Sequence, residues 1–514
     1  MSTALQLGII VGYLLVALAV GLVAYRLTER TAEDFYLASR TFGTVVLLFT
    51  VFATLLSAFT FFGGPDNAYS LGPEWILVMG LMDGLIFAVL WYVIGYKQWL
   101  LGQREGYVTL GELLDDRFNS RRIRGLVAGV SLFWLFPYVM LQQIGAGAAI
   151  EGLTAGAVPF WGGATLITVF MIVYVALAGM RGIAWTDTLQ GLFMLAMIWL
   201  AFGWVLLAVD GGIGTINAGL QANAPEFFAL GGGAYTPQFM LTFAISIALG
   251  VTMFPQINQR FFAAKSERVL KRTFTLWPIL VLLLFVPAFL LGSWAAGLGI
   301  EANVAAGESV LPVLLETYTP TWFAALVIAG AIAAMMSSSD SMLLSGSSYF
   351  TRDLYRPFVD PGVSDRREDQ LGRIGVVVFA VSALLASLWA QGGGIGAATV
   401  GSLLVDIGDL AFGGFAQLAG PVLLALYWSG ITRAGMLAGI LVPQGLYLAF
   451  NFLPETSVSV PVLSDVTLFA TNYFGWGISL YLIALGLAVT VLVGMLTSPA
   501  PGAKPDLMEV THRD

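Results

Sequence analysis

The sequence contains no cysteine and only one histidine, His512, which lies in a polar tail. Without cysteine there can be no disulfide bridges, thiolate metal ligands or cysteine nucleophiles, and one tail histidine supports neither a catalytic triad nor a histidine-rich metal site. Charged residues are also scarce, at 11% of the chain, and the net charge of −8 is spread over many loops without a basic stripe. These absences disfavour an enzyme and a nucleic-acid-binding protein, and no organic cofactor is expected.

Apolar residues, by contrast, are abundant: they make up 58% of the 514 residues, and the mean hydropathy is +0.85. Both values indicate a membrane protein. We predict an all-α polytopic protein with about 13 transmembrane helices, because about 13 apolar stretches are long enough to cross a bilayer. These stretches lie at residues 5–25, 45–70, 75–96, 125–148, 158–179, 185–209, 238–258, 273–298, 322–348, 374–390, 400–427, 434–452 and 474–497.

The basic residues predict the orientation of the chain in the membrane. All 23 Lys and Arg residues follow odd-numbered stretches, whereas the alternate loops carry only acids. Because Lys and Arg collect in cytoplasmic loops, we expect the N-terminus outside and the C-terminus in the cytoplasm of a cell whose plasma membrane holds the protein. The first 25 residues lack a basic start and a cleavage site, so we expect them to be retained as a membrane span.

Two of the apolar stretches are interrupted by small polar residues, glycine and proline. One interruption covers residues 53–66 and the other residues 250–258. Broken helices at membrane depth line a cavity or hold an ion, and two of them five spans apart indicate an inverted repeat of five plus five helices. A helix that simply ends at Gly63-Gly64-Pro65 is the alternative for the first. The expected divisions are 1–44 (first helix and linker), 45–210 (first repeat), 211–237 (external loop), 238–427 (second repeat), 428–497 (two further helices) and 498–514 (cytoplasmic tail).

A polar row interrupts the ninth stretch, where Ser337, Ser338, Ser339, Asp340 and Ser341 follow one another. A carboxylate inside a membrane span is costly and persists mostly where it meets an ion, water or the interior of a bundle. Hydroxyls at helical spacing present hard oxygens on one face, which suits an alkali cation. The pattern indicates a sodium site in a transporter, although serines can also serve close helix packing.

Four other acids lie within apolar stretches. Asp187 begins a helix, where the helix dipole favours it, or it is a second carboxylate on the ion path. Asp83, Asp406 and Asp409 have no partner that the sequence identifies.

Several separate motifs resemble those of the sodium:solute symporter family, whose members share the LeuT-like five-plus-five repeat. They are D-F-Y-L-A-S-R at 34–40, A-T-L-L-S-A-F-T-F-F-G-G-P at 53–65, G-M-R-G-I-A-W-T-D-T-L-Q at 179–190, P-Q-I-N-Q-R-F-F-A-A-K at 255–265, and the serine-rich stretch that ends in D-L-Y at 353–355.

The resemblance implies a sodium site formed by the carbonyls of Ala53, Leu56 and Ala334 and the hydroxyls of Ser337 and Ser338. It also implies a possible second cation site that includes Asp187, Asp340 and Ser341, together with Ser337. Asp340 stands where some relatives have serine, so a proton or a structural hydrogen bond is an alternative to the second ion.

The solute pocket is expected around the two broken helices and the fourth span. The candidates are Ser57, Thr60, Tyr138, Gln142, Phe254 and Gln256. The proline permeases of the family have an acidic residue where this chain has Leu55, and aromatic residues where it has Ile247 and Val251, which disfavours proline. The pattern F-x-G-G-P-x-x-A-Y at 61–69 is closer to pantothenate permeases. A carboxylate such as pantothenate or a short monocarboxylate is therefore expected.

The sequence thus predicts a secondary transporter that couples sodium entry to uptake of a small organic solute by alternating access. Its expected partners are the solute and the lipid bilayer, with no nucleic acid and no evident protein partner. Two alternatives remain: a proton-coupled transporter that uses Asp340 and Asp187, and a membrane solute sensor that works with a separate protein.

Overall fold

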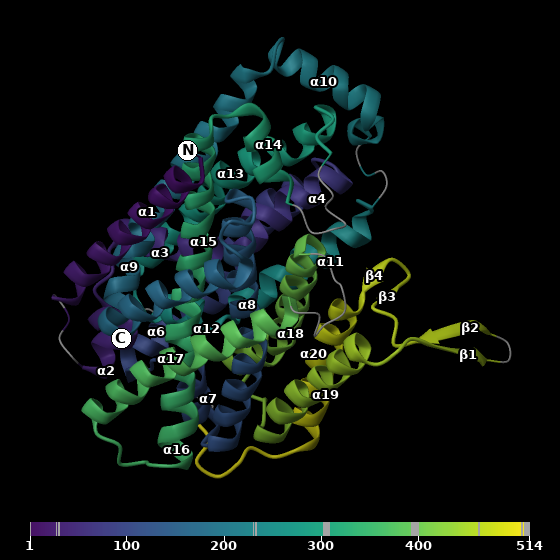
Figure 1. The fold of residues 1–514 in the computed structure, drawn as a ribbon. Helices are drawn as coiled ribbons and strands as arrows, with labels where there is room; N and C mark the ends of the chain where they lie inside the picture. Colours follow the sequence, from purple (N-terminus) through teal and green to yellow (C-terminus); the bar gives the residue numbers. More distant parts are fainter. Residues whose placement is uncertain are drawn as a thin grey trace.

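Long apolar helices dominate the computed structural model of the chain (Figure 1). The structure describes residues 2–504 and 507, apart from 27, 29–30, 230, 232–233, 302–308, 392–399 and 461–462. Within these residues, eleven helices are long and apolar enough to cross a membrane, and two bent pairs bring the count to 13. The predicted number of spans is therefore confirmed. His512 and Glu308, which the sequence places in loops or the tail, lie outside the described residues.

The spans follow the predicted order along the chain. They are α1 (Ser2–Tyr25), the pair α3 (Thr44–Leu55) and η2–α4 (Phe59–Leu71), η3–α5–η4–α6 (Ile76–Glu105), α8 (Arg121–Leu153), the two halves of α9 (Phe160–Ala208), the pair α11 (Pro237–Thr252) and α12 (Pro255–Ala263), α13 (Glu267–Gly297), α15–η7–α16 (Thr321–Phe358), α17 (Asp365–Trp389), α18 (Val400–Tyr427), α19 (Arg433–Phe452) and α20 (Ile478–Leu496).

The two interrupted stretches are the two bent pairs. The axis of the chain turns by 67° between α3 and η2–α4 and by 56° between α11 and α12. At the second break Pro255, which has no N–H to donate, begins α12. The side-chain amide of Asn258 donates to the carbonyl of Thr252 at 3.2 Å and to that of Phe254 at 2.7 Å. One side chain thus joins the end of α11 to the start of α12 across the second break.

The fifth and sixth spans, Phe160–Leu177 and Gly179–Ala208, are two helices that meet with almost no connecting loop. The label α9 covers both, and the helical path is broken between them at Gly179, whose φ of 56° and ψ of −149° are non-helical and favour glycine. A Cβ at this position would lie 2.6 Å from the carbonyl oxygen of Phe35. Arg181, next to the kink, forms an ion pair with buried Asp34. A residue without a side chain is therefore needed where the two helices meet.

Short elements cover the two ends of the bundle (Figure 1). We call one end the α10 end and the other the α7 end. The first carries α10 (Gly212–Asn223), η5 (Pro225–Phe228) and α14 (Val310–Tyr318). The hairpin β3–β4 (Asn472–Tyr473, Trp476–Gly477) contacts α11 and α20, and the hairpin β1–β2 (Thr456–Val460, Leu463–Leu468) projects away from the bundle (Figure 1). The second carries α2 (Ala32–Leu37), η1 (Ala38–Arg40) and α7 (Leu110–Phe118).

Two of these end segments differ from the sequence-based expectation. The linker expected at 211–237 contains α10, because Ile216 and Leu220 are buried and support a helix there. The tail, expected only as a polar cytoplasmic segment, contacts α7: Lys504 N donates to the carbonyl of Arg117 at 3.0 Å, and Leu507 is buried. The polar composition of these segments does not predict that they pack against the rest of the protein.

Helix α15 lies at the centre of the bundle, where it packs against α9, α8 and α3. Its serines and Asp340 are fully buried. The polar row is therefore enclosed by protein on every side, as a bundle-interior site requires.

Candidate ion and solute site

The break after α3 frees backbone carbonyls that face the serines of α15. Leu56 is extended, with φ −86° and ψ 126°, and this turns the chain out of its helical path. Ser337 Oγ donates to the carbonyl oxygen of Ala53 at 2.7 Å. Ser338 Oγ lies 2.9 Å from the carbonyl oxygen of Thr54 and 2.6 Å from that of Leu56. Two neighbouring hydroxyls thus lie within hydrogen-bond distance of three carbonyls and can donate to two of them.

The amides beyond the break are satisfied by side chains as well. Ser57 N donates to Thr60 Oγ1 at 3.4 Å, and Ala58 N donates to Gln142 Oε1 at 2.9 Å. An uninterrupted helix would have used both amides to bind the carbonyls of residues 53 and 54. The unwound conformation is therefore supported from both sides of the break.

All five predicted sodium ligands come together at this junction. Ser337 Oγ also lies 2.9 Å from the carbonyl oxygen of Ala334, so the five oxygens form two sets on consecutive serines: Ser337 with Ala53 and Ala334, and Ser338 with Leu56. All five residues are at most 1% exposed. Three carbonyl and two hydroxyl oxygens form a neutral set of hard ligands, which suits a monovalent cation.

Beside this group lies a fully buried ion pair. Arg260 Nη2 donates to Asp187 Oδ2 at 3.0 Å, and both side chains are 0% exposed. The same guanidinium also donates to Ser341 Oγ and to Thr50, whose hydroxyl donates to Asp187. Arg260 thus supplies a positive charge between two of the residues proposed for a second cation site.

Asp340, the third of those residues, has a different partner. The hydroxyl of Tyr174 donates to Asp340 Oδ2, and Asp340 Oδ1 has no hydrogen-bond partner among the described residues. Asp340 and Asp187 therefore lie in the same polar layer without sharing a hydrogen bond.

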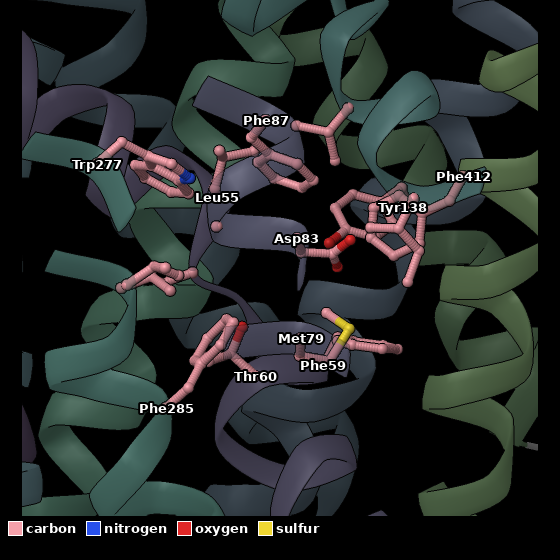
Figure 2. A pocket seen from close by; sticks show the side chains of 15 residues that line it. Leu55, Phe59, Thr60, Met79, Asp83, Phe87, Tyr138, Trp277, Phe285 and Phe412 are labelled. Carbon is pink, nitrogen blue, oxygen red and sulfur yellow. The ribbon is translucent and has the colours of Figure 1, made fainter. Parts of the chain in front are cut away.

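A separate pocket lies on the other side of the break, and its lining side chains nearly fill it, leaving a cavity of about 30 Å³ (Figure 2). This volume holds about one or two water molecules, so the lining side chains must move apart to admit a small organic molecule. We call this space the aromatic pocket, because six aromatic side chains line it together with aliphatic residues, Thr60 and one carboxylate. Its lining comprises Leu55, Leu56, Phe59, Thr60, Met79, Asp83, Gly84, Phe87, Tyr138, Ile247, Val251, Trp277, Val281, Phe285 and Phe412.

The predicted pocket residues divide into two groups. Thr60 and Tyr138 line the aromatic pocket, whereas Ser57, Gln142 and Phe254 lie just behind that lining. Ser57 Oγ is 3.2 Å from the Tyr138 hydroxyl, and the Phe254 ring lies 5.5 Å from the Tyr138 ring.

Gln256 begins α12 and is fully buried. Its side-chain amide has no hydrogen-bond partner among the described residues, and it is not one of the residues that line the aromatic pocket.

A wider, more open hollow adjoins the aromatic pocket on the side of the β3–β4 hairpin, and we call it the vestibule. The two spaces share Ile247 and Phe412. The Phe412 ring packs parallel to that of Phe254 at 5.6 Å and edge-on to that of Phe59 at 5.7 Å. Phe412 therefore stands between the vestibule and the aromatic pocket.

The comparisons with known proteins agree with this architecture. The model of the sodium:solute symporter family matches residues 35–443. The sodium/pantothenate symporter of Escherichia coli (strain K12) is 30% identical over 447 residues, which cover 85% of this chain and 89% of that protein. The sodium/sialic acid symporter SiaT of Proteus mirabilis is 28% identical over 516 residues, or 96% of this chain and 94% of that protein. The chain belongs to the sodium:solute symporter family.

Solved structures show the same fold. A Na⁺-coupled sialic acid symporter in a substrate-bound outward-open state has a TM-score of 0.73 at 22% identity, covering 97% of this chain and 99% of that one. Mhp1, a nucleobase-cation-symport-1 family transporter, has a TM-score of 0.56 at 15% identity, covering 92% and 98%. The family, the LeuT-like fold and the class of sodium-coupled solute symport predicted from the sequence are therefore confirmed.

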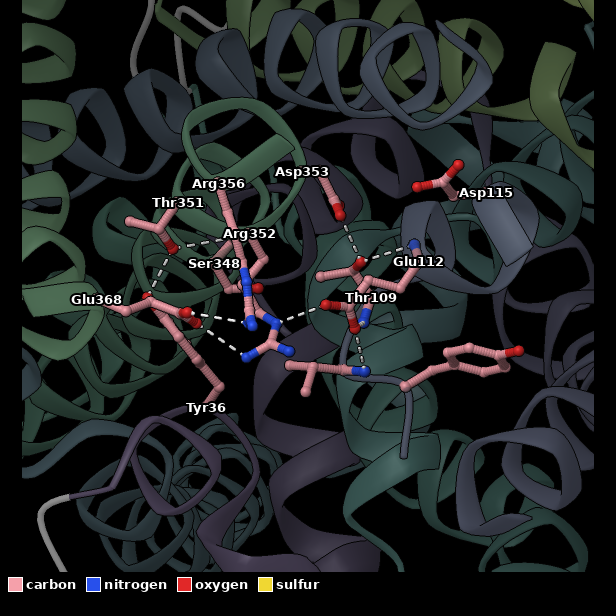
Figure 3. Close-up of polar contacts among 12 residues, drawn as sticks. Tyr36, Thr109, Glu112, Asp115, Ser348, Thr351, Arg352, Asp353, Arg356 and Glu368 are labelled. Atoms are coloured by element: carbon pink, nitrogen blue, oxygen red, sulfur yellow. Dashed lines mark hydrogen bonds and ion pairs between the residues drawn. The ribbon is translucent and has the colours of Figure 1, made fainter. Parts of the chain in front are cut away.

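At the α7 end of this symporter a network of ion pairs joins α7, α8, η7 and α17 (Figure 3). Glu112 Oε1 lies 2.7 Å from Arg352 Nε and 3.1 Å from Arg124 Nη2. Arg352 also binds Glu368 at 2.8 Å, and Arg124 binds Asp353 at 2.8 Å. Burial alone would raise the pKa of Glu112, but Arg352 and Arg124 hold it below its usual value. The network therefore ties together the ends of four helices.

Sequence reasoning missed the role of Arg260 and most of the aromatic pocket. Arg260 stands in the motif at 255–265, but its loop-like sequence position gave no sign that it is buried against Asp187. Asp83 was recognised only as an acid without a partner. Its position inside an apolar span was the available signal, because ionisable residues there are functional candidates by default.

Proposed function

We propose that this symporter binds its coupling sodium ion at the junction of Ala53, Leu56, Ala334, Ser337 and Ser338 and carries a small organic solute in the aromatic pocket. The observation that carries the proposal is the pair of adjacent oxygen sets, five neutral oxygens in all, at the break in the second span. Leu56 belongs to both places, because its carbonyl joins the ion group and the residue also lines the aromatic pocket.

This shared residue explains how ion and solute are coupled. A cation at the junction would order the unwound backbone at Leu56 and so shape one wall of the aromatic pocket. Coupling requires that the ion bind the outward-facing and inward-facing states with different affinity. With the predicted orientation, the membrane potential adds about 2.3 kcal/mol per charge per 100 mV to the driving force for entry.

The charged residues around the junction bear on how many sodium ions the protein binds. Arg260 already neutralises Asp187, which leaves Asp340 as the carboxylate available to a second cation. We propose one sodium ion at the five-oxygen group and keep the site of Asp187, Asp340 and Ser341 as a prediction. The sodium/pantothenate symporters among the relatives support a small organic solute of modest size.

The test is uptake into proteoliposomes that contain the purified protein. Candidate solutes are offered with an inward sodium gradient and with a matched potassium gradient. Accumulation that requires sodium and increases with a negative interior potential supports the proposal. Equal uptake in sodium and potassium contradicts it.

A proton-coupled mechanism is the second candidate, and the observation in its favour is Asp340. This carboxyl group is fully buried and bonded to a tyrosine hydroxyl rather than to a basic residue, so it is a plausible carrier of a proton. Uptake driven by an inward pH gradient in sodium-free buffer, lost in Asp340→Asn, would support this mechanism. Dependence on sodium at constant pH would contradict it.

A further inference from the structure

One buried carboxyl group in the spans lacks the partners that the others have. Asp83 begins α5 and is 2% exposed, and neither of its carboxylate oxygens has a hydrogen-bond partner among the described residues. Other buried acids differ: Asp187 is paired with Arg260, Asp353 with Arg124 and Asp34 with Arg181, and Asp340, which has no basic partner, accepts from the hydroxyl of Tyr174 at one oxygen. A buried carboxylate without a partner is strongly unfavourable, so such a group either takes up a proton or binds a cation that arrives from outside.

Asp83 points into the aromatic pocket. Figure 2 shows its carboxyl group in the middle of the lining side chains, near the ring of Tyr138. Six aromatic rings surround this space, and the Phe87 and Trp277 rings stack at 6.0 Å while those of Tyr138 and Phe412 lie 5.3 Å apart. Aromatic faces attract cations, and several rings around one site are a typical arrangement for substituted ammonium groups.

The charges around the pocket point the same way. Among the described residues, none that line the aromatic pocket and none that line the vestibule is Lys or Arg. The vestibule instead presents Asp406 and Asp409 next to Phe412. Negative charge along this route attracts cations and disfavours a solute whose only charge is a carboxylate.

We propose that Asp83 and the surrounding aromatic rings bind a protonated or quaternary ammonium group of the transported solute. The inference rests on the proposed function, because it identifies the chemical class of the solute in the same pocket. This proposal differs from the solute class that the sequence predicts. A solute whose only charged group is a carboxylate does not suit the lining of the aromatic pocket. A zwitterion suits it. Its ammonium group would bind Asp83, and its carboxylate would lie toward Leu56, next to the proposed sodium site.

Four probes test the proposal by direct binding to the full-length protein in detergent with sodium present. Choline and glycine betaine carry a quaternary ammonium group. The neutral isostere of choline, in which a tert-butyl group replaces trimethylammonium, has the same shape without the charge. Pantothenate carries only a carboxylate. Binding of choline or glycine betaine, with weaker binding of the isostere and of pantothenate, is the expected result.

The variant Asp83→Asn keeps the shape of the side chain and removes its charge. It should weaken binding of the ammonium probes by about thirtyfold or more, as expected when one partner of a desolvated charge pair is removed. Asp210→Asn is the matched control, because it removes the same charge at an exposed position at the end of α9. It should leave binding unchanged.

Three results would overturn the proposal: no binding of either ammonium probe, equal binding of choline and its neutral isostere, or unchanged binding in Asp83→Asn. Sodium-induced thermal stabilisation without solute is measured in parallel, in the wild type and in Asp83→Asn. Its presence shows that the variant is folded, and it tests the sodium junction separately. If sodium stabilises the protein but the ammonium probes fail, only this inference falls; if sodium has no effect, the proposed function itself is contradicted.

Discussion

Asp187 and Asp83 are both buried carboxylates within the membrane spans, yet their surroundings are opposite. Asp187 is held by Arg260 and by the hydroxyls of Thr50 and Thr54. Asp83 faces aromatic rings and has no partner among the described residues. A carboxylate with a built-in cation stabilises the fold, whereas one without a partner is suited to bind a cation from outside. The polar layer at the break thus has a structural role in this comparison, and the aromatic pocket has a ligand-binding role.

The largest effect is expected from breaking the built-in pair. Arg260→Gln leaves Asp187 buried and unpaired, which costs about 3–5 kcal/mol for a buried ion pair that loses one partner. The melting temperature in detergent should fall sharply. Lys271→Gln is the control, because Lys271 pairs with Glu267 on a half-exposed surface of α13, where such pairs contribute about 0.3–0.5 kcal/mol.

A double variant distinguishes charge from packing in that experiment. Arg260→Gln with Asp187→Asn removes both charges, and it should recover part of the stability lost in Arg260→Gln. If the double variant is less stable than the single one by a further full increment, the two residues act independently and the pairing in the polar layer is not what stabilises it.

Glu112 extends the comparison to a paired carboxylate at the α7 end. Glu112→Gln should lower stability by about 1.5–3 kcal/mol near neutral pH, as for hydrogen bonds to charged groups. The two arginines depress the pKa of Glu112 below about 4.5 in the folded protein. Its contribution is therefore complete above that value and is lost as the pH falls through the lower folded-state pKa.

Thermal unfolding of the wild type and of Glu112→Gln as a function of pH measures this contribution. The difference between them should be constant from neutral pH down to about 4.5 and should shrink at lower pH. A difference that grows on acidification would mean that the arginines do not hold Glu112 in its charged form.

Much of this architecture could be predicted because it depends on local patterns. Apolar length located the spans, and small polar residues located the breaks at Leu56 and Pro255. The junction could be predicted from a resemblance because Ser337 and Ser338 are adjacent in sequence and face a short motif. Gly179 shows the limit of this approach: its kink depends on contact with Phe35, which is distant in sequence.

The aromatic pocket could not be predicted in the same way. Its rings come from η2, α5, α8, α13 and α18, and each of them is indistinguishable in sequence from ordinary apolar packing. The orientation of Asp83 depends on π-helical turns in η3 just before it, which the sequence pattern does not reveal. Only the tertiary fold shows that one acid and six rings share a cavity.

The sodium junction gives a smaller, ion-specific effect. Ser338→Ala removes the hydroxyl that meets Leu56 and Thr54, so the sodium concentration for half-maximal uptake should rise by roughly tenfold, which corresponds to about 1.4 kcal/mol. Ser345→Ala is the control on the same helix, because Ser345 donates to the carbonyl of Met342 within α15. Unchanged sodium dependence in Ser338→Ala would remove the proposed ion from this junction.

The smallest change in stability is expected for Asp83→Asn. The direction of this change should be opposite to that for Asp187→Asn. Without solute, Asp83→Asn should leave the melting temperature unchanged or raise it slightly, by at most about 1 kcal/mol, because an amide is cheaper to bury than an unpaired carboxyl group. Asp187→Asn should lower it, because Arg260 then loses its counter-charge. A loss of more than about 2 kcal/mol in Asp83→Asn would exceed that range and show that Asp83 has a structural partner. In that case Asp83, like Asp187, would be held by a partner within the protein, and it would not be free to bind a cation of the solute.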